Sequence, residues 1–129
     1  MPAYEWPAET AIEAFIHNAE AWRHANHWQT PAEIALAVAA APANLGGVVP
    51  AGQTRRIREI TIRHTGSNNT VISVNIGVFA RITIDVPAQT TRVWSSEDGI
   101  EFYGGEQPTI QTSDVTGGGA QVSARGDEA

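Results

Sequence analysis

The spacing of apolar residues along the chain changes near residue 45. In residues 1–44 the apolar positions recur every three or four residues, which is the spacing of one helical face. The residues of this face are Ile12, Phe15, Ile16, Ala19 and Trp22. The pattern predicts a first helix over about residues 8–25.

A second helix is predicted over residues 31–41, because its start and its end both carry capping signals. Thr30, Pro31 and Glu33 have the types and spacing of an N-cap, a first-turn proline and a capping-box glutamate. Pro42 ends the helix, since proline lacks the N–H that a helix interior needs. Residues 1–44 are therefore expected to form an N-terminal α-helical arm.

From residue 48 onward apolar residues alternate with polar ones, as in β-strands with one buried face. The clearest runs cover residues 60–63, 71–78 and 80–86. About seven short strands at roughly ten-residue spacing indicate a sandwich or a small barrel. We expect a mainly β domain over residues 48–125, an antiparallel β-sandwich of immunoglobulin-like or jelly-roll-like type, and a C-terminal tail over residues 126–129.

The composition of the 129 residues excludes several classes of chemistry. The chain has no cysteine, which rules out disulfides, thiolate metal sites and cysteine nucleophiles. All 8 basic residues are arginine, so there is no lysine for a Schiff base or a P-loop. The net charge of −6 opposes a nucleic-acid partner. No apolar run is long enough to cross a bilayer and no secretory signal is visible, so no membrane partner is expected.

Two groups of side chains have spacings that could support metal or acid–base chemistry. His17, Glu20, His24 and His27 share one face of the first predicted helix or its end, a spacing that can hold a transition metal. That face lies opposite the apolar one, so we favour a polar or partner-facing surface there. Glu97, Asp98 and Glu101 flank the turn at Gly99 without a companion nucleophile. We therefore expect no catalytic residue, no metal and no cofactor.

The tripeptide Arg125-Gly126-Asp127 matches a cell-adhesion motif. Three residues near a chain end match such a motif often by chance, and no secretion signal accompanies them. We do not expect an adhesion function.

Large aromatic residues and clustered arginines are the best candidates for a partner interface. Trp6, Trp22 and Trp28 lie in or near the predicted arm, which is too small to cover them with its own core. Either the sandwich or another chain covers them. The arginines fall within one predicted strand and suit either a solvated strand face or an acidic protein partner. The candidate interface residues are Trp6, Phe15, Trp22, Trp28, Arg55, Arg56, Arg58, Arg63 and Trp94.

The stretch from Val49 to Arg125 resembles small β-sandwich structural proteins of tailed bacteriophage particles. The resemblance rests on ordered segments: Val-Pro-Ala-Gly-Gln-Thr at residues 49–54, the strand and turn at 57–66, the strand at 70–77 and the Ile-Asp-Val-Pro-Ala-Gln-Thr-Thr segment at 84–91. The sequence departs from the family at residues 97–99 and 103–106, where an Ala-Gly-Asp type of turn is usual. Residues 1–44 match no part of the family.

The resemblance implies a non-enzymatic component of the virion, assembled in the host cytoplasm. We expect a capsid decoration or cement protein that binds the major capsid protein, as a trimer or a ring. A neck, tail or baseplate component is the first alternative. A carbohydrate- or receptor-binding module, with Trp94 and Tyr103 as its platform, is the alternative from another class.

Overall fold

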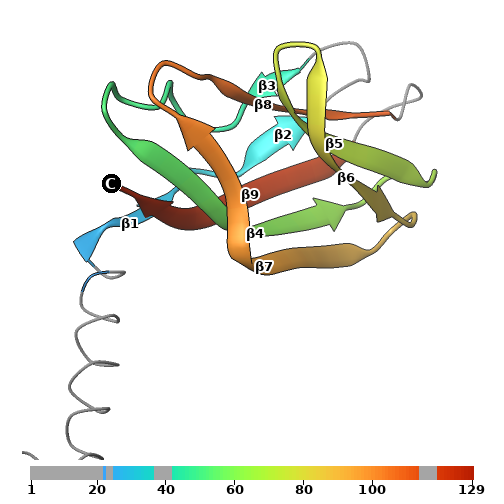
Figure 1. Cartoon of the computed structure of the whole chain (residues 1–129). Coiled ribbons are helices and arrows are strands. Elements are labelled where there is room, and N and C mark those ends of the chain that lie inside the picture. Colours follow the sequence, from blue (N-terminus) through green and yellow to red (C-terminus); the bar gives the residue numbers. More distant parts are fainter. Residues whose placement is uncertain (1–21, 23–24, 37–41, 114–118) are drawn as a thin grey trace, which may run out of the picture.

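The computed structural model describes residue 22 and residues 25–36, 42–113 and 119–129 (Figure 1). These residues form two antiparallel β-sheets that enclose one apolar core. The strands are β1 (His27–Gln29), β2 (Ile34–Leu36), β3 (Ala43–Asn44), β4 (Thr54–His64), β5 (Thr70–Ile76), β6 (Phe79–Val86), β7 (Thr91–Tyr103), β8 (Pro108–Thr112) and β9 (Ala120–Glu128). The prediction of a mainly β, antiparallel sandwich is confirmed.

The C-terminal strand β9 lies inside the first sheet rather than at its edge. It pairs with β4 on one side and with both β1 and β2 on the other, and β7 borders β4 (Figure 1). The second sheet has the order β3-β8-β5-β6, so β6 forms one of its edges. Within the described residues, no helix is long and apolar enough to span a membrane.

The core is built by the period-two alternation, which turns every second side chain of a strand toward the opposite sheet. Most of its fully buried members come from the two sheets: Ile57, Ile60, Ile62, Phe102 and Val122 from the first, Ile72, Val74, Val86 and Ile110 from the second. Leu45 and Val49, in the loop before β4, are also fully buried. Each such side chain contributes roughly 1.5–3 kcal/mol relative to an exposed one.

A β-bulge in β4 explains why two of its core residues, Ile57 and Ile60, are three positions apart. The pairing register of β4 with β9 shifts between Ile57 and Glu59, which leaves Arg58 as the extra residue. Opposite β7 the same step faces residues 96–99, so there the extra residues belong to β7. The bulge restores the alternation, so isoleucines on both sides of it face the core. Gly126 of β9 lies against this bulge, where a side chain has no room.

The second predicted helix, residues 31–41, is wrong where the structure describes it. Ile34–Leu36 is strand β2 and pairs with β9, while residues 37–41 lie outside the described part. Thr30 does not cap a helix. Its N–H donates to the carbonyl of Ala124 at 2.9 Å, and its hydroxyl accepts from the Ala124 N–H at 3.2 Å. Hydrogen bonds between this segment and β9 thus override the local capping signal.

The first predicted helix, residues 8–25, falls almost entirely outside the described residues. Trp22 and Ala25 have helical backbone conformation, and Asn26 N–H donates to the Trp22 carbonyl at 3.0 Å. The rest of the helical arm stays a prediction. The expected boundary near residue 44 does not separate the sheets, because β1, β2 and β3 precede it and belong to them.

The predicted C-terminal tail, residues 126–129, is also wrong. Gly126, Asp127 and Glu128 continue β9 and pair with β4. Asp127 and Gly126 also pair with β1 on the other side. The strand continues to Glu128 because both neighbours offer backbone hydrogen-bonding groups up to that point.

Candidate interaction surface

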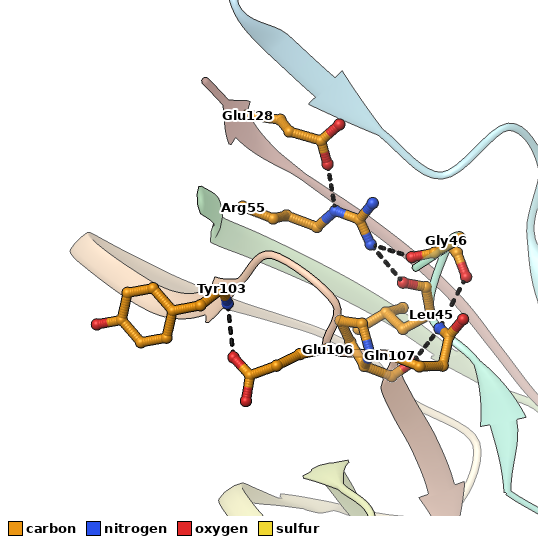
Figure 2. A network of polar contacts seen from close by, with 9 residues as sticks. Leu45, Gly46, Arg55, Tyr103, Glu106, Gln107 and Glu128 are labelled. Carbon is orange, nitrogen blue, oxygen red and sulfur yellow. Dashed lines mark hydrogen bonds and ion pairs between the residues drawn. The ribbon is translucent and has the colours of Figure 1, made fainter. Parts of the chain in front are cut away.

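Arg55 was expected at a partner interface but lies inside the sandwich, with a side chain only 3% exposed. Its Nε donates to Glu128 Oε2 at 2.7 Å and its Nη1 to the Gly47 carbonyl at 2.6 Å. The guanidinium also lies 4.5 Å from the ring centroid of Trp28. Figure 2 shows Arg55 between Glu128 and the backbone at Leu45. Arg55 therefore joins segments of its own chain and presents no charge to a partner.

The other three clustered arginines lie at the surface, and each has a carboxylate partner in this chain. Arg56 pairs with Glu101, Arg58 with Asp127 at 2.6 Å, and Arg63 with Glu33 at 2.9 Å. The pairs of Arg56 and Arg63 are exposed to solvent and contribute little to stability, about 0–1 kcal/mol, whereas the pair of Arg58 with Asp127 is largely buried. Their main effect here is to neutralise the charge that was expected to attract an acidic partner.

The Arg125-Gly126-Asp127 tripeptide is a structural part of β9. Arg125 pairs with Glu59 at 2.7 Å, and Gly126 lies against the β4 bulge. Asp127 is only 6% exposed and binds Arg58. Arg125 is 60% exposed, but the buried Asp127 carboxylate is not presented as an adhesion motif requires.

The candidate aromatic residues separate into three groups. Trp28 and Trp94 are partly buried and pack against the core. Trp22 is 49% exposed, just before β1. Trp6 and Phe15 lie outside the described residues.

Trp94 and Tyr103 do not form the platform that a carbohydrate-binding module would need. Trp94 pairs with Ile60 and Tyr103 pairs with Thr54, six positions away on β4. This separation is about 20 Å along the strand. In addition, Trp94 packs into the core, whereas Tyr103 is exposed.

In its described part, the structure brings together none of the residues whose spacing could support metal or acid–base chemistry. Of the histidine group, only His27 is described; its Nε2 lies 3.2 Å from Gln29 Oε1, on β1. His17, Glu20 and His24 lie outside the described residues. Over residues 25–36, 42–113 and 119–129, no three His, Asp or Glu side chains are arranged to hold a metal ion. Glu97 and Asp98 are exposed on β7.

Glu101 has a pKa below its ordinary value, and the cause is local hydrogen bonding. The Tyr103 hydroxyl donates to Glu101 Oε2 at 2.8 Å, and Arg56 adds a second hydrogen bond and its charge. The same contact raises the pKa of Tyr103, because its hydroxyl must keep its proton to donate. The contact favours folding above the ordinary pKa of Glu101, and this contribution is lost as the pH falls through the lowered pKa.

Replacing Tyr103 with phenylalanine is expected to raise the pKa of Glu101 toward its ordinary value, because the largest cause of the shift is removed. A pH titration of the Glu101 carboxyl carbon by NMR measures this change. Thr109→Ser, on β8, serves as the control and should leave the titration unchanged. An unchanged Glu101 pKa in Tyr103→Phe would assign the whole shift to Arg56.

Two exposed apolar residues, Val78 and Phe79, were not recognised as candidates from the sequence. They are 92% and 74% exposed, at the turn between β5 and β6. Ile76 pairs with Phe79, so Gly77 and Val78 form a two-residue turn. Gly77 has a φ of 57°, as the first position of a type II′ turn requires. Gly77 is the sequence signal for a turn at this point. The apolar alternation continues through Val78, however, and the pattern therefore predicts one strand over residues 71–78.

The opposite end of the same hairpin carries a hollow of about 260 Å³. β5 begins there at Thr70, paired with Val86 at the end of β6. The hollow is lined by apolar and polar residues: Asn69, Thr70, Val71, Asp85, Val86, Pro87 and Ser113. Val71 is among the exposed apolar residues, so this end also offers apolar surface.

Comparisons with known proteins give no family. No protein-family model matches the chain, and no curated protein matches it. One of the similar solved structures is a chain described under "Bacillus endospore appendages form a novel family of disulfide-linked pili". It is 16% identical, with a TM-score of 0.46 over 79% of this chain and 88% of that chain.

Proposed function

We propose that this chain is a non-enzymatic structural subunit of a tailed-bacteriophage virion, most specifically a decoration protein that binds the major capsid lattice. The resemblance of residues 49–125 to phage structural proteins supplies the class of particle. The observation that carries the proposal is the distribution of exposed groups. Among the described residues, five ion pairs neutralise most of the charge on the first sheet, whereas large apolar side chains remain exposed. Such a surface suits burial against a neighbour.

The N-terminal segment is the proposed contact with the capsid lattice. It joins the sandwich at β1, whose three residues pair with Gly126, Asp127 and Arg125 of β9. Trp28 of β1 packs against the core and stacks on Arg55. The segment before β1 is therefore attached to the sandwich at a fixed point, and Trp22 lies exposed five residues before β1.

Copy number tests the proposal and separates it from the neck, tail or baseplate alternative. Purified particles are quantified by calibrated mass spectrometry, with this chain measured against the major shell protein. Hundreds of copies per particle are expected for a decoration protein. A dozen or fewer would assign the chain to the neck, tail or baseplate, and absence from particles would refute the virion proposal.

Replacing Trp22 with serine is expected to reduce incorporation into particles about tenfold or more, because interface tryptophans often dominate binding. The full-length variant is added to undecorated particles, and the bound fraction is measured after sedimentation. Val93→Ser is the matched control, since Val93 is 55% exposed on the sandwich body and Trp22 is 49% exposed. Equal occupancy of the Trp22 variant and the wild type would remove the N-terminal segment as the anchor.

A further inference from the structure

The turn between β5 and β6 carries exposed apolar residues, although its turn type does not call for apolar residues. A type II′ turn needs glycine at its first central position, which Gly77 supplies, but it needs no apolar residue at the second. Val78 nevertheless occupies that second position and Phe79 follows it, and both are largely exposed. We call these two residues the tip.

The hollow at the far end of the β5–β6 hairpin is large enough to receive the tip. Its volume is about 260 Å³, and a cavity of about 150 Å³ already holds a benzene-sized group. Val71 and Pro87 supply apolar walls, whereas Val86 is only 1% exposed, and Asn69, Thr70 and Ser113 supply polar groups. We call this site the end hollow. The tip and the end hollow lie at opposite ends of the same two strands.

Arg81 near the tip and Asp85 at the end hollow carry opposite charges. Arg92 donates to the Asp85 backbone carbonyl at 2.9 Å, and the charge of Arg81 acts on Glu101 of its own chain. Arg81 follows Phe79 by two residues, and its guanidinium lies 5.7 Å from the Phe102 ring centroid. Within the part of the chain that the structure describes, Arg81 forms no ion pair with a carboxylate, in contrast to the arginines of β4. Asp85 lines the end hollow and is likewise without an ion pair among the described residues.

From these features we infer that the chain associates head to tail, with the tip of one copy seated in the end hollow of the next. Phe79 fills the apolar part of the hollow, and Arg81 of the seated copy pairs with Asp85 at its rim. Each copy carries one tip and one hollow, so the contact is heterologous and continues into a ring or a filament.

The inference concerns the isolated chain and does not depend on the proposed function. A decoration protein that forms rings would use this contact between its own copies and the N-terminal segment for the capsid. Failure to associate in solution would leave the proposal of a virion subunit in place. Absence from particles would leave the self-association in place.

Sedimentation velocity of the full-length protein at increasing concentration measures the association. The wild type is expected to form species larger than a monomer as the concentration rises. Phe79→Asp is expected to weaken the association at least tenfold, because a carboxylate would enter the apolar hollow beside Asp85. Val93→Ser should associate as the wild type does. A wild type that stays monomeric, or a Phe79 variant that associates normally, would overturn the inference.

Mixing two defective variants tests the head-to-tail arrangement itself. Phe79→Asp destroys the tip and Val71→Asp destroys the end hollow, so each variant alone is expected to be monomeric. An equimolar mixture should form a dimer that stops at two copies, because one intact tip meets one intact hollow. A mixture that remains monomeric would refute the head-to-tail contact. A Val71→Asp variant that dimerises on its own would refute it too, and would indicate tip-to-tip pairing. Circular dichroism and thermal unfolding check that both variants are folded.

A charge swap gives a second, independent test at the rim. Arg81→Asp and Asp85→Arg are each expected to weaken the association several-fold, since each places like charges together. The double variant carries both changes and should recover most of the loss, because the pair is restored in reverse. A double variant as weak as the two single ones would contradict the pairing of Arg81 with Asp85.

Discussion

Replacing Gly126 with alanine is expected to lower the free energy of unfolding by about 3 kcal/mol or more, the range of severe core substitutions. A Cβ at this position would lie 1.8 Å from the carbonyl oxygen of Arg56 and 3.1 Å from the backbone nitrogen of Arg58. Both atoms belong to β4 at its bulge, between paired residues on either side. They cannot retreat without breaking the pairing of β4 with β9. Urea unfolding followed by tryptophan fluorescence measures the loss.

Gly47→Ala is the matched control for this substitution. No heavy atom lies within 4 Å of a Cβ built on Gly47, so its stability should change by less than about 0.5 kcal/mol. Equal stability of the Gly126 variant and the control would show that the bulge relaxes to accept a methyl group. The contrast also separates steric exclusion from the general effect of glycine replacement on the unfolded chain.

The central strands could be predicted from the sequence because their signal is long and local. The apolar alternation at residues 60–63, 71–78 and 80–86 corresponds to β4, β5 and β6, although the second run passes the end of β5 at Ile76. Each of these strands buries one face, and this fixes the phase of the alternation over several residues.

The short strands could not be predicted, because their pairing partners are remote. β1 and β2 have three residues each, and β3 has two. Their hydrogen bonds go to β8 and β9, and the bond between Thr30 and Ala124 spans 94 residues. Local capping signals at Thr30 and Pro31 are the stronger pattern in the sequence, and they predict a helix. Hydrogen bonding to β9 decides the conformation of residues 27–36, and no local pattern in the sequence reveals that partner.

The candidate interface arginines also have remote partners that a local sequence pattern does not reveal. Arg55 is two positions before Ile57, so it shares the inward phase of the strand, and this signal was available in the sequence. Arg56 has the opposite phase and is exposed enough to meet solvent. The partners that neutralise these arginines, Glu128 and Glu101, lie far along the chain. Pairing of this kind depends on the fold and is not encoded in the spacing of the arginines.

Replacing Arg55 with methionine is expected to lower the free energy of unfolding by about 3 kcal/mol, because one partner of a buried ion pair is removed. Methionine keeps the length of the side chain but leaves Glu128, itself only 18% exposed, without its cation. The carbonyl of Gly47 also loses its donor, and Trp28 loses the guanidinium over its ring. β1, β9 and the loop before β4 lose their common contact. Urea unfolding gives the magnitude, and hydrogen exchange should show faster opening at β1.

Two further variants test whether burial of the charge causes this effect. Arg56→Met breaks a pair in which both side chains are 35% exposed, so it should cost less than about 1 kcal/mol. The double variant Arg55→Met/Glu128→Gln should recover part of the loss, because the carboxylate left unpaired is removed as well. Equal losses for Arg55→Met and Arg56→Met would contradict an interior role for Arg55. A double variant less stable than Arg55→Met would show that Glu128 stabilises the end of β9 through a contact other than its ion pair with Arg55.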